Sequence, residues 1–102
     1  MRMTTTTQLV LTALLDDPAV ERFGAEIRMM AGLASGTLYP ILARLEGVGW
    51  LESRWEDIDA RVAGRPARRY YRLTAEGEMR AQDALARAHR PRIQLRPLGG
   101  EA

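Results

Sequence analysis

Apolar residues recur at helical spacing in three successive stretches of the chain, and each stretch predicts a helix. The stretches cover residues 4–15, 20–31 and 35–46. The apolar positions that define their faces are Leu9, Val10, Ala13 and Leu14; Phe23, Ile27 and Met30; and Leu38, Ile41, Leu42 and Leu45. Each stretch is followed by a residue that disfavours helical backbone, namely Pro18, Gly32 and Gly47.

The first predicted helix is apolar on more than one side, because Leu11 and Leu15 widen its face. A helix of this kind is usually covered on two sides. Threonines precede it and can cap its start. We therefore expect it to pack in the core and also against a second copy of the chain.

Single residues in the next two helices indicate how they pack and begin. Gly24 weakens the second helix, which indicates close packing against another helix. Ser35 or Thr37 is expected to cap the third helix. Pro40 keeps the start of that helix near Ser35, because proline is tolerated only in the first turn.

After residue 49 the apolar spacing changes from helical to alternating. Residues 51–56 and 70–73 alternate and flank a polar segment, 57–67, that contains glycine and proline. This pattern predicts a β-hairpin with a long loop. Of Tyr70 and Tyr71, one is expected to pack on the core. Two tryptophans, Trp50 and Trp55, are interpreted as core or dimer contacts.

A fourth helix is predicted over residues 75–90, with Thr74 as its cap and Pro91 as its stop. Its apolar face is narrow and consists mostly of alanine. The chain is thus read as one domain, residues 1–90, followed by a loosely held tail, residues 91–102. The predicted fold class is mainly α with a small hairpin: three helices, a hairpin and a closing helix, the element order of a winged helix-turn-helix.

The charges indicate a surface suited to an acidic partner. The 102-residue chain has 15 basic and 13 acidic residues, and every basic residue is arginine. Coding bias in a GC-rich genome explains the missing lysines, but residues 61–72 hold five of the arginines and no acid. With no cysteine and one histidine, the chain has no means of forming a disulfide or a multi-histidine metal site. We see no signal peptide and no membrane span, and expect a cytoplasmic protein without a cofactor.

Two long segments resemble a known family. Residues 35–46 (SGTLYPILARLE) and 64–74 (GRPARRYYRLT), followed by Gly77, are similar to signatures of the PadR family of bacterial transcriptional regulators. Residues 23–27 (FGAEI) resemble the family's second-helix element, with Phe23 where tyrosine is more usual. The resemblance runs from about residue 8 to residue 88 and implies a homodimeric winged-helix repressor that binds an inverted repeat in double-stranded DNA.

The fourth helix departs from the family pattern. In the family, dimerisation uses the first and last helices, which here points to Leu11, Leu15, Ala81, Leu85 and Ala88. This last helix is short and carries no aromatic residue. Small family members line a drug-binding chamber between protomers with such aromatics, so a chamber of that kind is not expected here. A small-molecule effector stays unidentified.

The candidate DNA contacts lie on the third helix and the hairpin. Hydroxyls and free N–H groups at a helix start suit phosphates or base edges, and arginine binds phosphates and narrow minor grooves. The candidates are Ser35, Thr37, Tyr39, Pro40, Arg44, Arg61, Arg65, Arg68, Arg69 and Tyr70. A structural interpretation stays open for each type of candidate: the hydroxyls cap, Tyr39 packs, Arg44 pairs with Glu46 or a neighbour, and the wing arginines form a solvated face.

Two other classes of function fit the sequence less well than DNA binding. No phosphate-binding loop, serine elbow or paired His89 indicates catalysis, so we expect no enzyme. The alternative is a winged helix that acts as a protein-binding adaptor or antagonist of another regulator. The arginine-rich hairpin favours DNA, because an adaptor does not need it.

Overall fold

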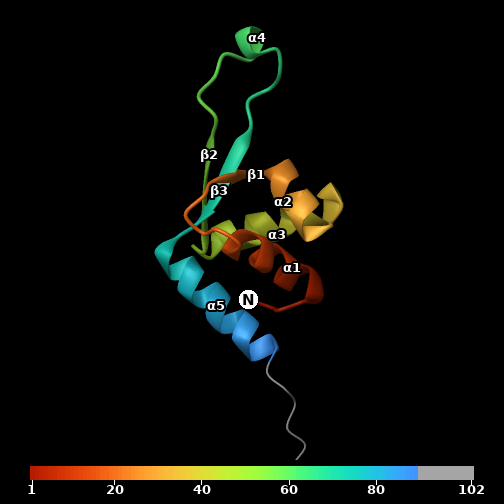
Figure 1. The fold of residues 1–102 in the computed structure, drawn as a ribbon, viewed down its shortest axis with the longest axis vertical. Coiled ribbons are helices and arrows are strands. Elements are labelled where there is room, and N and C mark those ends of the chain that lie inside the picture. The colour runs from red at the N-terminus through yellow and green to blue at the C-terminus, as the bar shows by residue number, and fades with distance from the viewer. Residues whose placement is uncertain (90–102) are drawn as a thin grey trace, which may run out of the picture.

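The computed structural model describes residues 1–89 and shows a helical body from which a long hairpin projects (Figure 1). This arrangement confirms the predicted winged-helix fold class, mainly helical with a small antiparallel sheet. In chain order, its elements are α1 (Thr5–Leu15), β1 (Arg22–Phe23), α2 (Gly24–Ala31), α3 (Ser35–Gly47), β2 (Leu51–Trp55), α4 (Ala60–Ala63), β3 (Arg69–Leu73) and α5 (Ala75–Ala88).

The sheet is antiparallel, with strand order β1-β3-β2. In the hairpin, Leu51 pairs with Leu73 and Trp55 pairs with Arg69. The short strand β1 was not predicted, since residues 20–31 were read as one helix. Arg22 and Phe23 instead pair with β3, and α2 begins only at Gly24. A ladder with a distant strand leaves no trace in local spacing, which explains the error.

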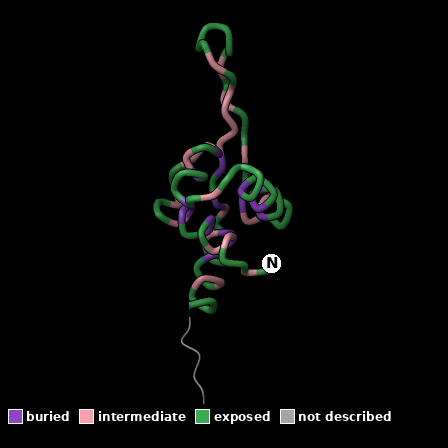
Figure 2. The backbone as a smooth tube through the Cα atoms, turned by 90° about the vertical axis from the view of Figure 1, so that its right-hand side faces the viewer, coloured by how far each residue is buried: buried purple, intermediate pink, exposed green. Residues whose placement is uncertain are grey.

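Helix α1 lies at the centre of the body and contacts α2, α3, α5 and β3. Buried residues gather there, whereas the projecting part of the hairpin, residues 52–70, is exposed or half-buried (Figure 2). Most of the apolar surface of α1 is therefore covered within one chain. Leu11 and Ala81 are fully buried in this core, so neither offers surface for dimerisation. Leu9, predicted on the core face, is exposed instead.

The buried face of α2 differs from the predicted one. It consists of Gly24, Ile27 and Ala31, whereas Met30 is exposed and Phe23 precedes the helix. The prediction followed the large apolar residues. The structure buries Ile27 with two small residues instead, and Gly24 lets Tyr39 of α3 approach closely.

Helix starts are capped partly as expected. Thr4 Oγ1 accepts a hydrogen bond from Thr7 N–H, and Thr74 Oγ1 accepts one from Gly77 N–H. The prediction for α3 is wrong, since Ala34 is its N-cap and no side chain caps it. The hydroxyls of Ser35 and Thr37 are consequently left exposed at the start of α3.

Helix α3 begins at Ser35, as the position of Pro40 predicted, whereas the end of the last helix differs from the prediction. Pro40 lies inside α3, beyond its first turn. Helix α5 ends at Ala88, with His89 as C-cap, instead of continuing to residue 90. The stop predicted at Pro91 and the tail predicted over residues 91–102 lie outside the described residues.

The hairpin loop contains a one-turn helix, α4, which was predicted only as a polar loop. Asp59 caps its start, and Gly64 ends it in the left-handed conformation, with φ of 71°. Trp50 is half-buried against the core, as expected. Trp55 is 62% exposed, so its interpretation as a core residue is wrong. The register carries Trp55 beyond the helical body, out of reach of the core.

A bilayer-spanning helix would need about 20 apolar residues. Over residues 1–89, no helix has that combination of length and apolar character.

Candidate nucleic-acid interface

The outward face of α3 is lined by small side chains. Opposite the buried face lie Gly36, Pro40, Ala43 and Gly47, all of them exposed. Thr37 and Arg44, two turns apart, lie on one flank of this stripe, and Tyr39 and Glu46 lie on the other. An exposed helix whose outer face carries only small side chains, with polar residues on both flanks, can lie close to the floor of a DNA major groove.

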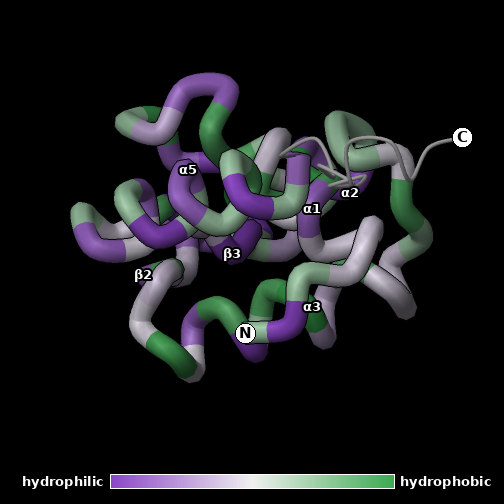
Figure 3. Tube along the Cα trace, turned by 90° about the horizontal axis from the view of Figure 1, so that it is seen from below, coloured by the Kyte–Doolittle hydropathy of each residue, from purple (hydrophilic) through white to green (hydrophobic). Residues whose placement is uncertain are grey.

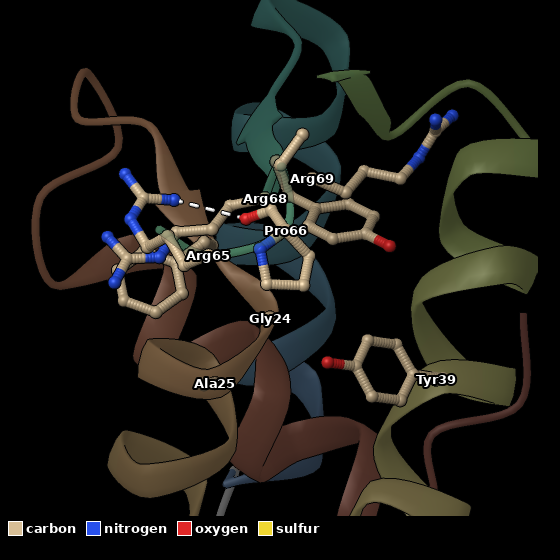
Figure 4. Close-up of a pocket in the computed structure, with 10 residues that line it drawn as sticks. Gly24, Ala25, Tyr39, Arg65, Pro66, Arg68 and Arg69 are labelled. Atoms are coloured by element: carbon tan, nitrogen blue, oxygen red, sulfur yellow. Dashed lines mark hydrogen bonds between the residues drawn. The ribbon is translucent and has the colours of Figure 1, made fainter. Parts of the chain in front are cut away.

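Tyr39 lies directly against α2. A methyl group added at Gly24 would lie 2.8 Å from Tyr39 Cε1, which leaves space for hydrogen only. This confirms the prediction that Gly24 marks a close approach between helices. The contact fixes the Tyr39 ring, whose hydroxyl points toward Gly24 at the start of α2 (Figure 4).

A recess of about 470 Å³ lies between the start of α2, Tyr39 and the returning arm of the hairpin. We call it the wing recess. Apolar and aromatic groups form its floor, and three arginines border it, with Arg65 and Arg68 on the side opposite Tyr39 (Figure 4). Its lining residues are Phe23, Gly24, Ala25, Tyr39, Arg65, Pro66, Ala67, Arg68, Arg69 and Tyr71.

Arg65 is held by Glu56 on the opposite arm of the hairpin. Its Nη1 and Nη2 donate to the two carboxylate oxygens of Glu56, at 2.7 Å and 3.0 Å. The same carboxylate accepts from Arg68 N–H, at 3.2 Å. Glu56 thus joins the two arms beyond the last residues of the ladder, and two of the N–H donors of Arg65 are already used in binding it.

Hydrogen bonds from Arg65 hold the pKa of the Glu56 carboxyl at about 2, below its usual value of 4.5. Because the folded-state pKa is depressed, Glu56 stabilises the fold fully above about pH 4.5 and loses this effect as the pH falls toward 2. The unfolding temperature of Glu56→Gln should therefore lie below that of wild type near neutral pH. Thermal melts at stepwise lower pH should show this gap narrowing between pH 4.5 and 2.

The matched control for Glu56 is Asp57→Asn. Asp57 is the next residue and is also acidic. It is exposed, and among residues 1–89 no arginine pairs with it. No gap that narrows with acid is expected for this variant. A gap for Glu56→Gln that stayed constant down to pH 2 would show that the carboxylate charge plays no part in joining the two arms.

Arg68 has no carboxylate partner within residues 1–89. Its guanidinium lies over the ring of Phe23, 4.2 Å from the ring centroid. The ring orients the charge at the edge of the wing recess and leaves its N–H donors free. Of the three arginines at this recess, Arg68 is the most available to an anion.

Arg69 takes part in the junction between α3 and the hairpin. Glu46, near the end of α3, accepts a hydrogen bond from Ser53 Oγ at 2.6 Å, and Arg69 Nη2 lies 3.8 Å from the same carboxylate. The Arg69 guanidinium also lies 5.1 Å from the centroid of the Trp55 ring. This junction sets the angle between helix and hairpin.

The two tyrosines of β3 point to opposite faces, as predicted. Tyr71 is buried, and burial raises the pKa of its phenol. Tyr70 is half-buried and contacts the Phe23 ring edge-to-face, 5.9 Å between centroids. Tyr70 therefore supports Phe23, which in turn supports Arg68.

The acid-free arginine run does not remain uncompensated in the fold. Arg72 pairs with Glu52 at 2.7 Å, and Arg65 pairs with Glu56, both across the hairpin. The run itself contains no acid, but the antiparallel register brings Glu52 and Glu56 opposite two of its arginines. At the hairpin tip, Arg61 is exposed beside the exposed acids Asp57 and Asp59.

Arg44 is exposed, as predicted, and forms no ion pair with Glu46 or any other acid within residues 1–89. Its alternative interpretation as a salt-bridge residue is therefore not supported. Ser35 and Thr37 are also exposed and their hydroxyls make no hydrogen bond in this part of the chain.

The sequence profile of the transcriptional regulator PadR-like family matches residues 19–83, from β1 through most of α5. The chain belongs to this family. PadR-like proteins are transcriptional regulators, not enzymes. The match includes α3 and the whole hairpin, and thus every candidate DNA contact named above.

Solved structures agree with the family assignment. A PadR-like transcription factor from Bacteroides fragilis is 27% identical, with a TM-score of 0.61 and 82% of each chain covered. AbfR bound to DNA is 29% identical, with a TM-score of 0.64, and the match covers 84% of this chain and 56% of that one. PcaV from Streptomyces coelicolor is 28% identical, with a TM-score of 0.61, over 81% of this chain and 54% of that one. No curated protein matches the chain in sequence.

Several residues of this PadR-like interface were not predicted from the sequence. They are Phe23, Glu46, Ser53 and Glu56. These side chains hold the hairpin and its arginines in place, and none of them is a residue type that typically binds DNA. The role of Glu56 could have been predicted from the sequence, because pairing the two predicted strands places this residue opposite the arginine run. The described residues contain no cluster of three His, Asp or Glu side chains that could hold a metal ion.

Proposed function

We propose that this chain is a transcriptional repressor that binds an inverted-repeat operator in double-stranded DNA as a homodimer. The observation that carries the proposal is Arg68, which pairs with no acid within residues 1–89 and is held over Phe23 in the recess that Tyr39 of α3 also lines. A helix for the major groove and a free cation for the backbone thus lie next to each other.

The residues divide into three roles in this proposal. Ser35, Thr37, Tyr39 and Pro40 enter the major groove with α3, and Arg44 lies on its flank. Arg61, Arg68 and Arg69 bind backbone phosphates or the minor groove from the hairpin. Arg65 and Tyr70, first considered as direct contacts, act mainly by holding the hairpin and Phe23 in place.

Dimerisation is proposed through the surface that α1 and α5 leave exposed. Leu15 and Leu85 are half-buried and Ala88 is exposed, so these three retain surface for a partner. Leu11 and Ala81 contribute from beneath by supporting the two helices. A twofold dimer is the commonest closed assembly, and it would place two copies of α3 on one face of the duplex. A regulator of this kind acts on DNA in the cytoplasm.

The test is an unbiased selection of duplexes bound by the purified protein, followed by footprinting and light scattering. We expect an inverted repeat with half-site centres about 10 bp apart, or a multiple of that, and a dimer mass. Affinity should fall steeply as salt rises, because phosphate contacts release counterions. One asymmetric half-site or a monomer mass would contradict the dimer. A flat salt response would contradict DNA binding and favour the adaptor.

A further inference from the structure

Two unpaired arginines lie together on the side of α3 that faces away from the hairpin. A recess of about 590 Å³ lies between the N-terminal segment, the start of α1 and the end of α3. We call it the α1–α3 recess. Arg2 and Arg44 both line it, and within residues 1–89 neither forms an ion pair. Figure 3 shows the N-terminus lying beside α3.

The two flanks of α3 differ in what they contact. On one flank, Glu46 accepts from Ser53 of the hairpin, so this is the wing side. On the other flank, Arg44 lies two turns after Thr37 and borders the α1–α3 recess. A helix about 10–12 Å wide fills a major groove about 12 Å wide, so a phosphate wall stands on each side of it. The hairpin serves only one of these walls.

We propose that Arg2 and Arg44 form a phosphate-binding site for the DNA backbone on the flank of α3 opposite the hairpin. The site rests on the proposed function, and it gives α3 a cationic support on both sides. Arg68 holds the backbone on the wing side, and the Arg2–Arg44 pair holds it on the other. The N-terminal segment thereby becomes part of the DNA-binding surface.

The surroundings of the recess favour an anion. The side chains of its other lining residues are uncharged: Met1, Thr4, Thr7, Gly47 and Val48. The first turn of α1 also carries no acid. No carboxylate of the recess therefore competes for the two guanidinium groups, in contrast to Arg65, which Glu56 already holds.

The experiment compares duplex binding by wild type, Arg2→Ala, Arg44→Ala and the double variant over a range of salt concentrations. The control is Arg72→Ala, which removes the same charge from an arginine that pairs with Glu52 across the hairpin. We expect the double variant to bind all duplexes about tenfold or more weakly, with a salt slope lower by about two per protomer. The control should bind like wild type. The double variant Arg2→Lys with Arg44→Lys should keep most of the wild-type affinity.

Phosphate ethylation interference locates the contacts. In wild type, modification should interfere on both walls of the groove, and in the double variant it should cease to matter only on the wall away from the hairpin. A double variant with unchanged affinity and salt slope would overturn the site. If Arg68→Ala still weakened binding, the proposed function would survive; if it did not, both would fail. A changed base preference with an unchanged slope would assign Arg44 to base reading and also overturn the phosphate site.

Discussion

Gly77→Ala is expected to lower the unfolding temperature of this protein by about 10 °C or more. Gly77 is buried in the first turn of α5, and an added methyl carbon would lie 2.6 Å from the carbonyl carbon of Trp50 and 2.7 Å from its Cα. Those atoms are backbone and have no rotamer by which to move away. Trp50 O also accepts from Thr74 N–H at 2.9 Å, so its peptide is fixed at the junction of hairpin and α5.

Overpacking of this kind costs about 1–3 kcal/mol or more, and each kcal/mol shifts the unfolding temperature of a domain this size by about 4–8 °C. The measurement is thermal unfolding followed by circular dichroism. Gly47→Ala is the control, because nothing lies within 4 Å of the added methyl group and helical backbone favours alanine. Gly47→Ala should equal or exceed wild type in stability. A Gly77→Ala variant as stable as wild type would show that α5 can move away from Trp50 at little cost.

Arg68→Ala is expected to weaken binding to every duplex about tenfold or more near 0.1 M salt, since a hydrogen bond to a charged group contributes about 1.5–3 kcal/mol. The guanidinium has no competing carboxylate in the described chain and lies over Phe23 beside the wing recess. Loss of one phosphate contact per protomer should lower the salt slope by about one per protomer. Stability should change little, because the side chain pairs with no acid.

Arg65→Ala is the comparison that separates direct contact from support. Arg65 is bound by both oxygens of Glu56, at 2.7 Å and 3.0 Å, so its removal should mainly loosen the hairpin. We expect a smaller change in salt slope than for Arg68→Ala, together with an altered unfolding profile. Fluorescence anisotropy with labelled duplex at several salt concentrations measures both slopes. If Arg65→Ala lowered the slope and Arg68→Ala did not, the two roles would be exchanged.

Much of this protein follows from its sequence because the decisive signals are local. The stripe Leu38, Ile41, Leu42 and Leu45 is repeated every turn of a helix, and all four residues are buried in the core. Thr4 and Thr74 cap their helices because the side chain and the N–H group that it accepts from are three residues apart. The alternation in β2 and β3 likewise predicted the hairpin and the burial of one of its two tyrosines, which the structure shows to be Tyr71.

Only the tertiary structure decided which apolar groups are buried within the chain and which charged groups find a partner there. Leu11 and Ala81 were predicted as interface residues, but the packing of α1 and α5 in the core buries both of them. Arg65 and Arg68 are alike in sequence, yet the hairpin brings Glu56 to one and Phe23 to the other. Spacing along the chain reports which face a residue occupies. What stands opposite that face depends on strand register and helix packing, which join residues far apart in sequence, and this is why the free arginines could be recognised only in the folded chain.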